Sequence, residues 1–445
     1  MRPNDHQLTE YAARRAELMR RIGVGGVAIV PAAHEHVRAR DTHHRFRQDA
    51  DFAYLTGFNE PDAVAVIAPG RKDEMDQPAE FVLFVRPRNA EREIWDGRRF
   101  GPEGAVALFG AQQAFSVDQL ASELPKLLSG RETVHYTLGE DPALDTTVIN
   151  VVRDIRAVAR RGSAAPNRFE ALENTLHEQR LLKRPSEIEL QRTACAISAA
   201  AHVRAMRATK PGRNEWEIAA EIAAEFTLKD CEPGYGTICG GGDNACILHY
   251  TENNQTLKDG ELLLIDAGAE YRGFTGDITR TFPINGTFTA AQKAVYEVVL
   301  AANKAAIATL VVGESVGKPH EVSTRVLTEG MVKLGLLSGD VETLIQEGKQ
   351  KQFFMHGTGH WLGMDVHDVG RYKLQGQYRR FEAGMVMTVE PGIYVAHGTP
   401  DVPSKFWGIG IRIEDDVLVT ENGPEVLTTG VPKEVADIEA LMRAA

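Results

Sequence analysis

The 445-residue sequence lacks the long apolar runs that membrane proteins need. No apolar stretch approaches the roughly 18 residues that a membrane-spanning helix requires. The first 23 residues have no apolar centre of the kind found in secretory signals, and they predict a charged amphipathic helix instead. These absences predict a cytoplasmic protein that has no membrane partner.

Cysteine is scarce, and positive charge is outnumbered. The four cysteines, at 195, 231, 239 and 246, include no CxxC pair, so we expect buried free thiols in a reducing compartment. The formal net charge is -12. A nucleic-acid-binding surface needs a clustered basic face, which this balance argues against. The composition favours small-molecule or peptide chemistry and no nucleic-acid partner.

Two familiar enzyme signatures are also missing. The stretch "GTGHWLG" is one residue too long for the dinucleotide-binding fingerprint, and it does not lie between a strand and a helix. No serine stands in the strand-to-helix turn typical of a hydrolase nucleophile. Nucleotide-dependent and serine-nucleophile chemistry are therefore disfavoured.

The length of the chain predicts two domains, because one hydrophobic core seldom organises so many residues. Between residues 27 and 85, short apolar runs alternate with turn-rich or helical stretches, a pattern typical of a mixed α/β layer. A polar segment of small residues at 161–169 is the first plausible linker. We predict domains at residues 1–174 and 175–445.

The second predicted domain alternates helix pairs with antiparallel strands. Long helices are expected after a Ser186/Glu189 capping box next to Pro185, near Asn214, and after a Thr289/Gln292 box. The expected strand runs are "CILHY", "ELLLIDAGAEYRGFTGDITRTF", "MVMTVEPGIYV" and "GIGIRIEDDVLVT".

Two acids interrupt the second of these strand runs. Asp266 and Asp277 stand among apolar residues, and the glycines between them allow the chain to fold back and bring the two carboxylates together. Burying two ionised carboxylates without partners would destabilise the folded state by several kcal/mol. One alternative is that one acid caps a turn while the other pairs with Arg280. The other is that a cation lies between them.

The later strands favour the cation. Glu390 and Glu414 each follow an apolar run, and "MHGTGHWLG" contributes His356 and His360. Glycines between the two histidines make a helix there improbable, so we expect the two imidazoles to have different roles. Four carboxylates and one imidazole can hold two divalent cations. Oxygen-rich ligation favours Mn²⁺, with Zn²⁺, Co²⁺ and Fe²⁺ left open.

These residues carry a resemblance to a known family. The stretches "LLIDAGAEYRGFTGDITRTFP", "FFMHGTGHWLGMDVHDVG", "MTVEPGIYV" and "GIGIRIEDD" resemble the pita-bread metallopeptidases, and among them the aminopeptidase P group. "FRQDADFAYLTGFNEPDAV" and "EIWDGRR" resemble the N-terminal domain of that group. The resemblance implies a smaller N-terminal mixed α/β domain, creatinase-like, followed by a pita-bread catalytic domain of α+β type.

The resemblance also implies a role for each site residue. The implied metal ligands are Asp266, Asp277, His360, Glu390 and Glu414, with Asp277 and Glu414 bridging the two ions. The implied catalytic residues are Glu390 as the base, His249, His356 and His367. The implied substrate-binding residues are Tyr235, His249, His367, Tyr394, Arg412 and Trp95, the last reaching a neighbouring subunit. From the residues alone, Arg412 could either orient an acid or hold a substrate charge.

The activity implied by the resemblance is release of the N-terminal residue from peptides that have proline at the second position. The expected partners are such peptides and further copies of the chain, as a tetramer or dimer. The nearest alternative is a prolidase that cleaves Xaa-Pro dipeptides. A metal-free creatinase-type enzyme and a non-catalytic binding protein are further alternatives, against which the intact ligand set counts.

Overall fold

The structure, a computed structural model, describes residues 2–70, 80–158, 160 and 164–444. It divides into two compact units, Met1–Gln179 and Arg180–Ala445. The boundary predicted between residues 174 and 175 falls inside helix α7 (Glu173–Arg180).

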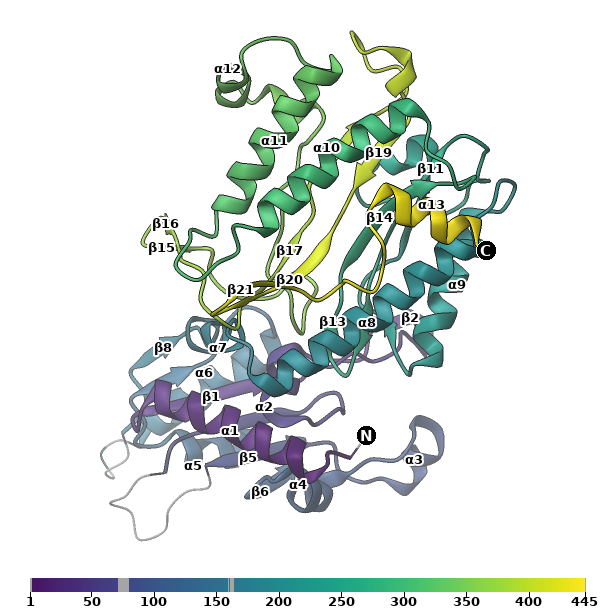
Figure 1. The fold of residues 1–445 in the computed structure, drawn as a ribbon. Coiled ribbons are helices and arrows are strands. Elements are labelled where there is room, and N and C mark those ends of the chain that lie inside the picture. Colours follow the sequence, from purple (N-terminus) through teal and green to yellow (C-terminus); the bar gives the residue numbers. More distant parts are fainter. Residues whose placement is uncertain (1, 71–79, 159, 161–163, 445) are drawn as a thin grey trace. The chain divides into compact units, whose positions relative to one another are not determined.

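The N-terminal unit, coloured purple to blue in Figure 1, is built on a mixed six-stranded sheet. Its strands run in the order β6-β5-β4-β1-β7-β8. Strand β1 pairs antiparallel with β4 and parallel with β7, so the sheet is neither purely parallel nor purely antiparallel. The apolar runs at the sheet centre are buried on both faces, as layers of helix on each side require. The predicted mixed α/β layer is confirmed.

The two longest helices of this unit, α1 and α6, have 18 and 16 residues. Its helices are α1 (Asp5–Ile22), α2 (Ala50–Thr56), α3 (Ala90–Asp96), α4 (Gly101–Phe109), the 3-10 helix η1 (Val117–Gln119), α5 (Leu120–Leu128), α6 (Pro142–Ala157) and α7. Its strands are β1 (Gly26–Pro31), β2 (Val37–Ala39), β3 (Thr42–His43), β4 (Val64–Ile67), β5 (Phe81–Val85), β6 (Gln113–Ser116), β7 (Thr133–His135) and β8 (Arg168–Glu170).

The linker predicted at 161–169 is only partly described. Residues 161–163 lie outside the described part of the chain, and Arg168 and Phe169 belong to β8 at the edge of the six-stranded sheet. Parallel pairing with β7 ties this strand to the N-terminal unit. Arg168 and Phe169 therefore belong to an exposed edge strand of the N-terminal sheet and not to a linker.

The C-terminal unit contains α8, a helix of 24 residues, and further helices of 6 to 18 residues. They are α8 (Pro185–Ala208), α9 (Glu215–Leu228), α10 (Ala290–Ile307), α11 (Lys318–Leu334), α12 (Val341–Gln346) and α13 (Val435–Arg443), with 3-10 helices η3 (Gly242–Cys246), η4 (Lys349–Gln352) and η5 (Ser404–Phe406). The strands are β9 (Glu232–Pro233), β10 (Ile238–Gly241), β11 (Leu262–Ala267), β12 (Ala269–Tyr271), β13 (Phe274–Thr275), β14 (Ile278–Pro283), β15 (Lys373–Leu374), β16 (Gln377–Tyr378), β17 (Val386–Val389), β18 (Gly392–Val395), β19 (Ile409–Arg412), β20 (Asp415–Thr420) and β21 (Gly423–Val426).

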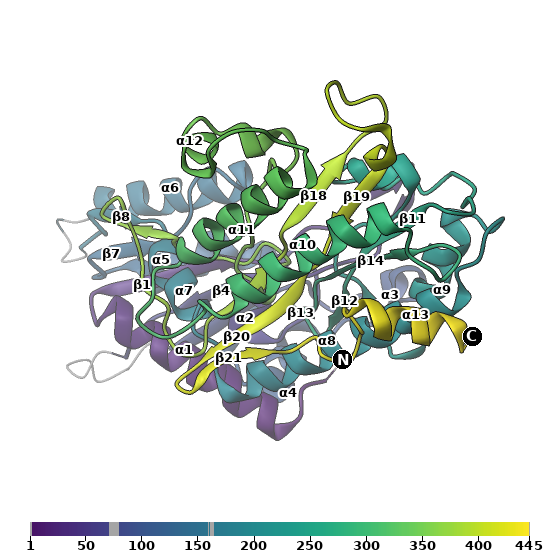
Figure 2. The same cartoon turned by 45° about the horizontal axis from the view of Figure 1, so that its top comes forward.

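Two helix pairs cover the strands of this unit. Helices α8 and α9 pack against one another, as do α10 and α11 (Figure 2). Helix α8 contacts β12, β13 and β14, and α10 contacts β17, β18 and β19. The predicted twofold alternation of helix pairs with antiparallel strands is confirmed. The strands between the helix pairs carry the candidate site residues.

All three predicted helix starts are confirmed, including the start of α8 at Pro185, but one of the two predicted capping boxes is not. Helix α9 follows Asn214, and α10 begins after Thr289, whose hydroxyl accepts from the backbone N–H of Gln292. The Ser186/Glu189 capping box at α8 is wrong. Pro185 occupies the first helical position, which moves the N-cap back to Arg184, and the carboxylate of Glu187 accepts the Arg184 backbone N–H at 2.9 Å.

The strand predicted for "CILHY" is also wrong. Cys246 ends the 3-10 helix η3, and the four residues after it lie in a turn or in irregular backbone. Short apolar runs do not by themselves distinguish a strand from a buried turn. The other three predicted strand runs contain β11 to β14, β17 with β18, and β19 with β20.

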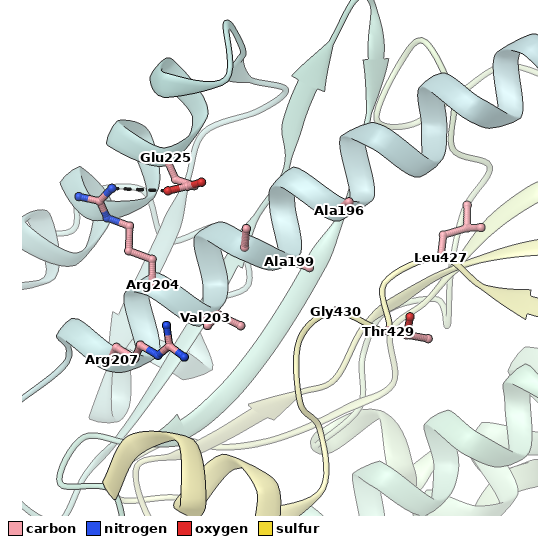
Figure 3. Close-up of a pocket in the computed structure, with 10 residues that line it drawn as sticks. Ala196, Ala199, Val203, Arg204, Arg207, Glu225, Leu427, Thr429 and Gly430 are labelled. Carbon is pink, nitrogen blue, oxygen red and sulfur yellow. Dashed lines mark hydrogen bonds and ion pairs between the residues drawn. The ribbon is translucent and has the colours of Figure 1, made fainter. Parts of the chain in front are cut away.

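A hollow of about 790 Å³ lies between α8, α9 and the chain after β21 (Figure 3). It is lined by alanines of α8 together with Val203, Arg204 and Gly430, and Arg204 forms an ion pair with Glu225 at 3.5 Å. None of the predicted site residues lines it. No helix within the described residues combines the length and apolarity needed to cross a membrane.

Candidate active site

The first two acids meet because β11 and β14 form an antiparallel hairpin. Asp266 in β11 pairs with Thr279 in β14, and Asp277 directly precedes β14. The hydroxyl of Tyr235 lies 2.6 Å from Asp266 Oδ1 and also contacts Asp277 Oδ1. One hydroxyl hydrogen can be donated to one carboxylate at a time, so acceptors outnumber donors here. The predicted convergence of the two acids is confirmed.

The alternative in which Arg280 pairs with one of these acids is wrong. Arg280 Nη2 donates to Asp415 Oδ1 at 2.7 Å, and both side chains are buried. Successive strand residues point to opposite faces, which explains why Arg280 and Asp277 diverge. Arg280 is therefore paired with Asp415 and with neither of the two site acids.

The two glutamates stand at a common break in two paired strands. The ladder between β17 and β20 ends at Val389 and Asp415, and the ladder between β18 and β19 begins at Gly392 and Arg412. Glu390 and Glu414 occupy the interval, where regular pairing is interrupted. The break brings both carboxylates into the pocket that also contains Asp266 and Asp277.

His360 reaches the same pocket from a non-helical loop, as predicted. Its Nδ1 lies 2.9 Å from the carbonyl oxygen of Trp361, which can only accept, so Nδ1 carries the hydrogen. Nε2 then faces the carboxylates, 3.4 Å from Asp277 and 3.6 Å from Glu390. Gly359 is needed here because a Cβ would lie 1.9 Å from the carbonyl oxygen of Thr388.

The donor set fits a divalent cation. Ligand atoms of Asp277, His360 and Glu414 all lie within 4.8 Å of one another. Burial raises the pKa of Asp277, raises that of Glu414 well above its usual range, and raises that of Glu390 to about 7. These shifts indicate that negative charge in the pocket is poorly compensated by the protein alone. Oxygen ligands with one imidazole suit a hard or borderline metal ion.

Arg412 is the cationic side chain that faces these acids. It is only 4% exposed, and its Nη2 donates to Asp266 Oδ2 at 2.6 Å. Its Nη1 donates to the hydroxyl of Tyr394 at 3.2 Å. Of the two roles that the sequence left open, orienting an acid is the contact observed.

His356 continues this chain of contacts. Its Nε2 lies 2.8 Å from the hydroxyl of Tyr394, and its Nδ1 lies 2.7 Å from the carbonyl oxygen of Gly357. Burial, with the nearby charge of Arg412, lowers the pKa of His356 to about 4. A neutral ring that donates from Nδ1 and accepts at Nε2 satisfies both contacts. His356 and His360, four residues apart, thus have different environments.

The remaining predicted histidines line the same pocket, which has a volume of about 510 Å³. His249 and His367 are exposed, and the ring of His367 packs edge-on to that of His360 at 4.3 Å. Partial desolvation of the ring at the pocket wall, together with the neighbouring His360, lowers the pKa of His367. Polar groups converge in the pocket while Ile238, Leu248 and Val366 supply apolar wall, a combination typical of small-molecule and peptide sites.

Trp95 belongs to the N-terminal unit. It lies in α3, a helix with no buried residue, and is 81% exposed. Its neighbour Ile94 is 80% exposed. A soluble surface seldom leaves two adjacent large apolar side chains so open without a partner.

Two threonines of the site were missed from the sequence. The hydroxyl of Thr279 donates to Glu414 at 2.6 Å and accepts from Arg412 Nε at 3.0 Å. The hydroxyl of Thr388 accepts the backbone N–H of His360 at 3.0 Å. Each threonine stands two residues from a site acid, Asp277 or Glu390, and strand periodicity places such residues on the same face. That spacing is the signal that could have identified them.

Comparisons with known proteins agree with this geometry. Metallopeptidase family M24 matches residues 189–421, and the N-terminal domain of aminopeptidase P matches residues 11–136. The chain is 44% identical over 437 residues to the Xaa-Pro aminopeptidase of Escherichia coli, covering 98% of each chain. It is 33% identical to Xaa-Pro aminopeptidase 3 of Homo sapiens, covering 97% of this chain and 85% of the relative.

Solved structures give the same result. The aminopeptidase PepP of Pseudomonas aeruginosa superposes with a TM-score of 0.95 at 50% identity, covering 98% of each chain. A zinc-substituted aminopeptidase P of Escherichia coli in complex with product superposes with a TM-score of 0.93 at 43% identity, again covering 98% of each chain. The chain therefore belongs to metallopeptidase family M24, with the pita-bread catalytic fold preceded by the N-terminal domain of aminopeptidase P.

Proposed function

We propose that this chain is an Xaa-Pro aminopeptidase, which releases the N-terminal residue from peptides that have proline at the second position. The observation that carries the proposal is the convergence of four carboxylates and His360 on one pocket, in a chain similar over 98% of its length to Xaa-Pro aminopeptidases. The prolidase alternative has no comparable observation in its favour.

The group implied by this donor set is a pair of divalent metal ions. Asp266, Asp277, His360, Glu390 and Glu414 would hold them. We assign the two bridging positions to Asp277 and Glu414, which are the most buried of the five at 4% and 2% exposed. Divalent ions, when bound, lower the pKa of a water molecule and polarise a peptide carbonyl. Mn²⁺ is our choice because oxygen ligands predominate.

We assign the role of general base to Glu390. Its two carboxylate oxygens lie 3.6 Å from His360 Nε2 and 3.8 Å from His356 Nδ1. Hydrolysis removes a proton from the attacking water and delivers one to the departing proline nitrogen. A carboxylate that faces the pocket on one side and two imidazoles on the other can hold that proton between the two steps.

His249, His356 and His367, which are not among the proposed metal ligands, would bind and orient the peptide. Neutral His356 is held by Tyr394, so its ring orientation is set before substrate arrives. His249 and His367 line the pocket and are exposed, so they would contact a substrate carbonyl or the proline ring. Tyr235, Tyr394 and Arg412 complete the substrate-binding set that we propose, the latter two mainly by orienting their neighbours.

An Xaa-Pro bond is a distinct target because its nitrogen carries no hydrogen. An enzyme that recognises the backbone N–H after the cleaved bond cannot use this substrate. The apolar wall formed by Ile238, Leu248 and Val366 offers a surface on which a proline ring can pack without that hydrogen bond.

We also propose that the chain forms a homo-oligomer, a tetramer or dimer, in which Trp95 reaches the active site of a neighbouring subunit. The support is that α3 buries no residue and leaves Ile94 and Trp95 open to solvent. Large aromatic side chains often contribute much of the binding energy at subunit contacts. The proposal would be refuted if light scattering shows a monomer and that monomer is fully active.

The function is tested with peptides of equal length that differ only at the second position. Chelated protein is reloaded with Mn²⁺ and incubated with Ala-Pro-Ala-Ala or Ala-Ala-Ala-Ala, and products are identified by mass spectrometry. We expect release of alanine from the proline peptide alone, and none from either peptide with the Asp277→Asn variant. Equal cleavage of both peptides, or undiminished cleavage by chelated protein, would refute the proposal.

A further inference from the structure

The break that presents Glu390 and Glu414 leaves two backbone carbonyls at its edge. They belong to Val389 and Ile413, the residues that immediately precede the two glutamates. The side-chain amide of Asn303 donates to both, at 3.0 Å to the Val389 oxygen and 3.2 Å to the Ile413 oxygen. Asn303 therefore joins the two strands at the points where their ligands emerge.

The position of Asn303 is unusual for its type. It lies in α10 among the buried residues Val299, Leu300, Ala302 and Ala306, and it is itself 0% exposed. Asparagine is a poor helix former, and a buried amide is costly unless its hydrogen bonds are made. An apolar residue would suit this helix face better unless the amide had a specific task.

The orientation of the amide is determined by its surroundings. Lys433 Nζ donates to Asn303 Oδ1 at 2.9 Å, so the oxygen faces an ammonium group and both amide hydrogens face carbonyl oxygens. The flipped amide would place its oxygen against two carbonyls and its hydrogens against the ammonium. The same Lys433 nitrogen also donates to Asp415 Oδ2 at 2.5 Å. The amide nitrogen and the amide oxygen of Asn303 are therefore both hydrogen-bonded in the observed orientation.

We infer that Asn303 is a positioning residue for the metal centre: it fixes the separation of Glu390 and Glu414 through the carbonyls that precede them. This inference rests on the proposed metal ligands. Asn303 lines no part of the pocket, and its effect is transmitted through backbone. A rigid spacing favours ion binding because the carboxylates then need no reordering when the ion arrives.

Two variants remove the double donor in different ways. Asn303→Asp keeps the shape and an acceptor for Lys433, but it offers carboxylate oxygen to both carbonyls. Asn303→Ser keeps a single hydroxyl in a smaller side chain. The matched control is Gln292→Met in the same helix, because Gln292 is also buried and its amide donates to the carbonyl of Gly260 at 2.8 Å, a residue outside the pocket.

The measurement is calorimetric titration of chelated protein with Mn²⁺ alone, together with thermal unfolding of the same samples. We expect both Asn303 variants to lose about tenfold or more in Mn²⁺ affinity, as is typical when residues supporting metal ligands are changed. Gln292→Met should unfold at a lower temperature and yet bind Mn²⁺ within about twofold of the unchanged protein, a spread smaller than the tenfold effect of lost ligand support.

Each other outcome decides against a specific claim. If the unchanged protein binds no Mn²⁺, the proposed function fails. If the unchanged protein binds Mn²⁺ and a cooperatively unfolding Asn303 variant binds it equally well, the inference alone fails. If neither Asn303 variant folds, Asn303 serves the fold as a whole and the positioning role is rejected.

Discussion

Arg412 and Asp266 form a buried ion pair in which Nη2 donates to Oδ2 at 2.6 Å. The same guanidinium also contacts the hydroxyls of Tyr394 and Thr279. One planar group with several fixed donors thus holds a proposed metal ligand, a tyrosine and a threonine in register. The single ammonium group of a lysine cannot make the same set of planar hydrogen bonds.

We therefore predict that Arg412→Lys lowers kcat/KM by about tenfold to a hundredfold, the range typical of a lost ligand-supporting contact. The charge is kept, so a role limited to charge would leave activity unchanged. Arg131→Lys is the control, because Arg131 is also buried and donates to two backbone carbonyls in the N-terminal unit. A similar loss of kcat/KM in both variants would show that the effect is general destabilisation.

The second prediction compares ligands with an outer histidine. Asp277→Asn and Glu414→Gln should each lose bound metal, because removing a shared carboxylate leaves the repulsion between two cations uncompensated. His249→Ala should keep its metal and turn over more slowly, since His249 is an exposed lining residue. Metal content after dialysis, measured by mass spectrometry, is the test. Equal occupancy in all three variants would overturn these roles.

The third prediction concerns the proposed base. Glu390→Gln nearly preserves shape, but the amide cannot accept a proton, so kcat should fall by at least about a hundredfold, as is common when general-base catalysis is removed. The folded structure should persist, which circular dichroism will show. Glu187→Gln is the control, since Glu187 is buried at the start of α8 and does not line the pocket. Near-normal kcat in Glu390→Gln would place the base elsewhere.

A fourth prediction concerns stability and pH. His202 in α8 is fully buried, its Nδ1 lies 2.9 Å from the Ser198 carbonyl oxygen, and burial lowers its pKa to about 4. Between that value and the ordinary pKa near 6.5, the unfolded chain binds a proton that the folded chain does not. The neutral imidazole of His202 therefore contributes fully to the free energy of unfolding above pH 6.5, and this contribution is lost as the pH falls from about 6.5 to about 4.

The variant His202→Leu should remove that dependence. On going from pH 7.5 to pH 5, the metal-free protein with His202 should lose about 2 kcal/mol more of its free energy of unfolding than the variant does. Urea denaturation at the two pH values measures both losses, and groups common to the two proteins cancel in the difference. An equal loss in the two proteins would show that His202 does not titrate between the folded and unfolded states.

The proposed metal ligands could be singled out from the sequence because acids next to apolar strand runs are conspicuous. Asp277 precedes such a run and Glu414 follows one, where burial is expected and charge is not, and the resemblance to a metallopeptidase family then implied their roles. The capping box at Ser186 failed because Pro185 occupies the first helical position, two residues earlier than a Ser186 N-cap would place it. "CILHY" failed because a short apolar run is compatible with a turn as well as a strand.

Asn303 could not be found in this way. It is one polar residue in an apolar helix, and the carbonyls that it contacts lie 86 and 110 residues further along the chain. Such a contact depends on how α10 packs against β17 and β19, which no local pattern encodes. Thr279 and Thr388 are an intermediate case, since their spacing from the acids was visible although their partners were not.

The most direct test of the account compares substrate lengths in one experiment. An aminopeptidase must accept chain beyond proline, whereas a dipeptidase gains discrimination by capturing the free carboxylate after proline. We propose measuring kcat/KM for Ala-Pro-Ala and Ala-Pro with Mn²⁺-loaded protein. The account predicts the higher kcat/KM for the tripeptide, with alanine released from its N-terminus and activity lost on chelation. Cleavage of the dipeptide with the tripeptide inert would contradict it.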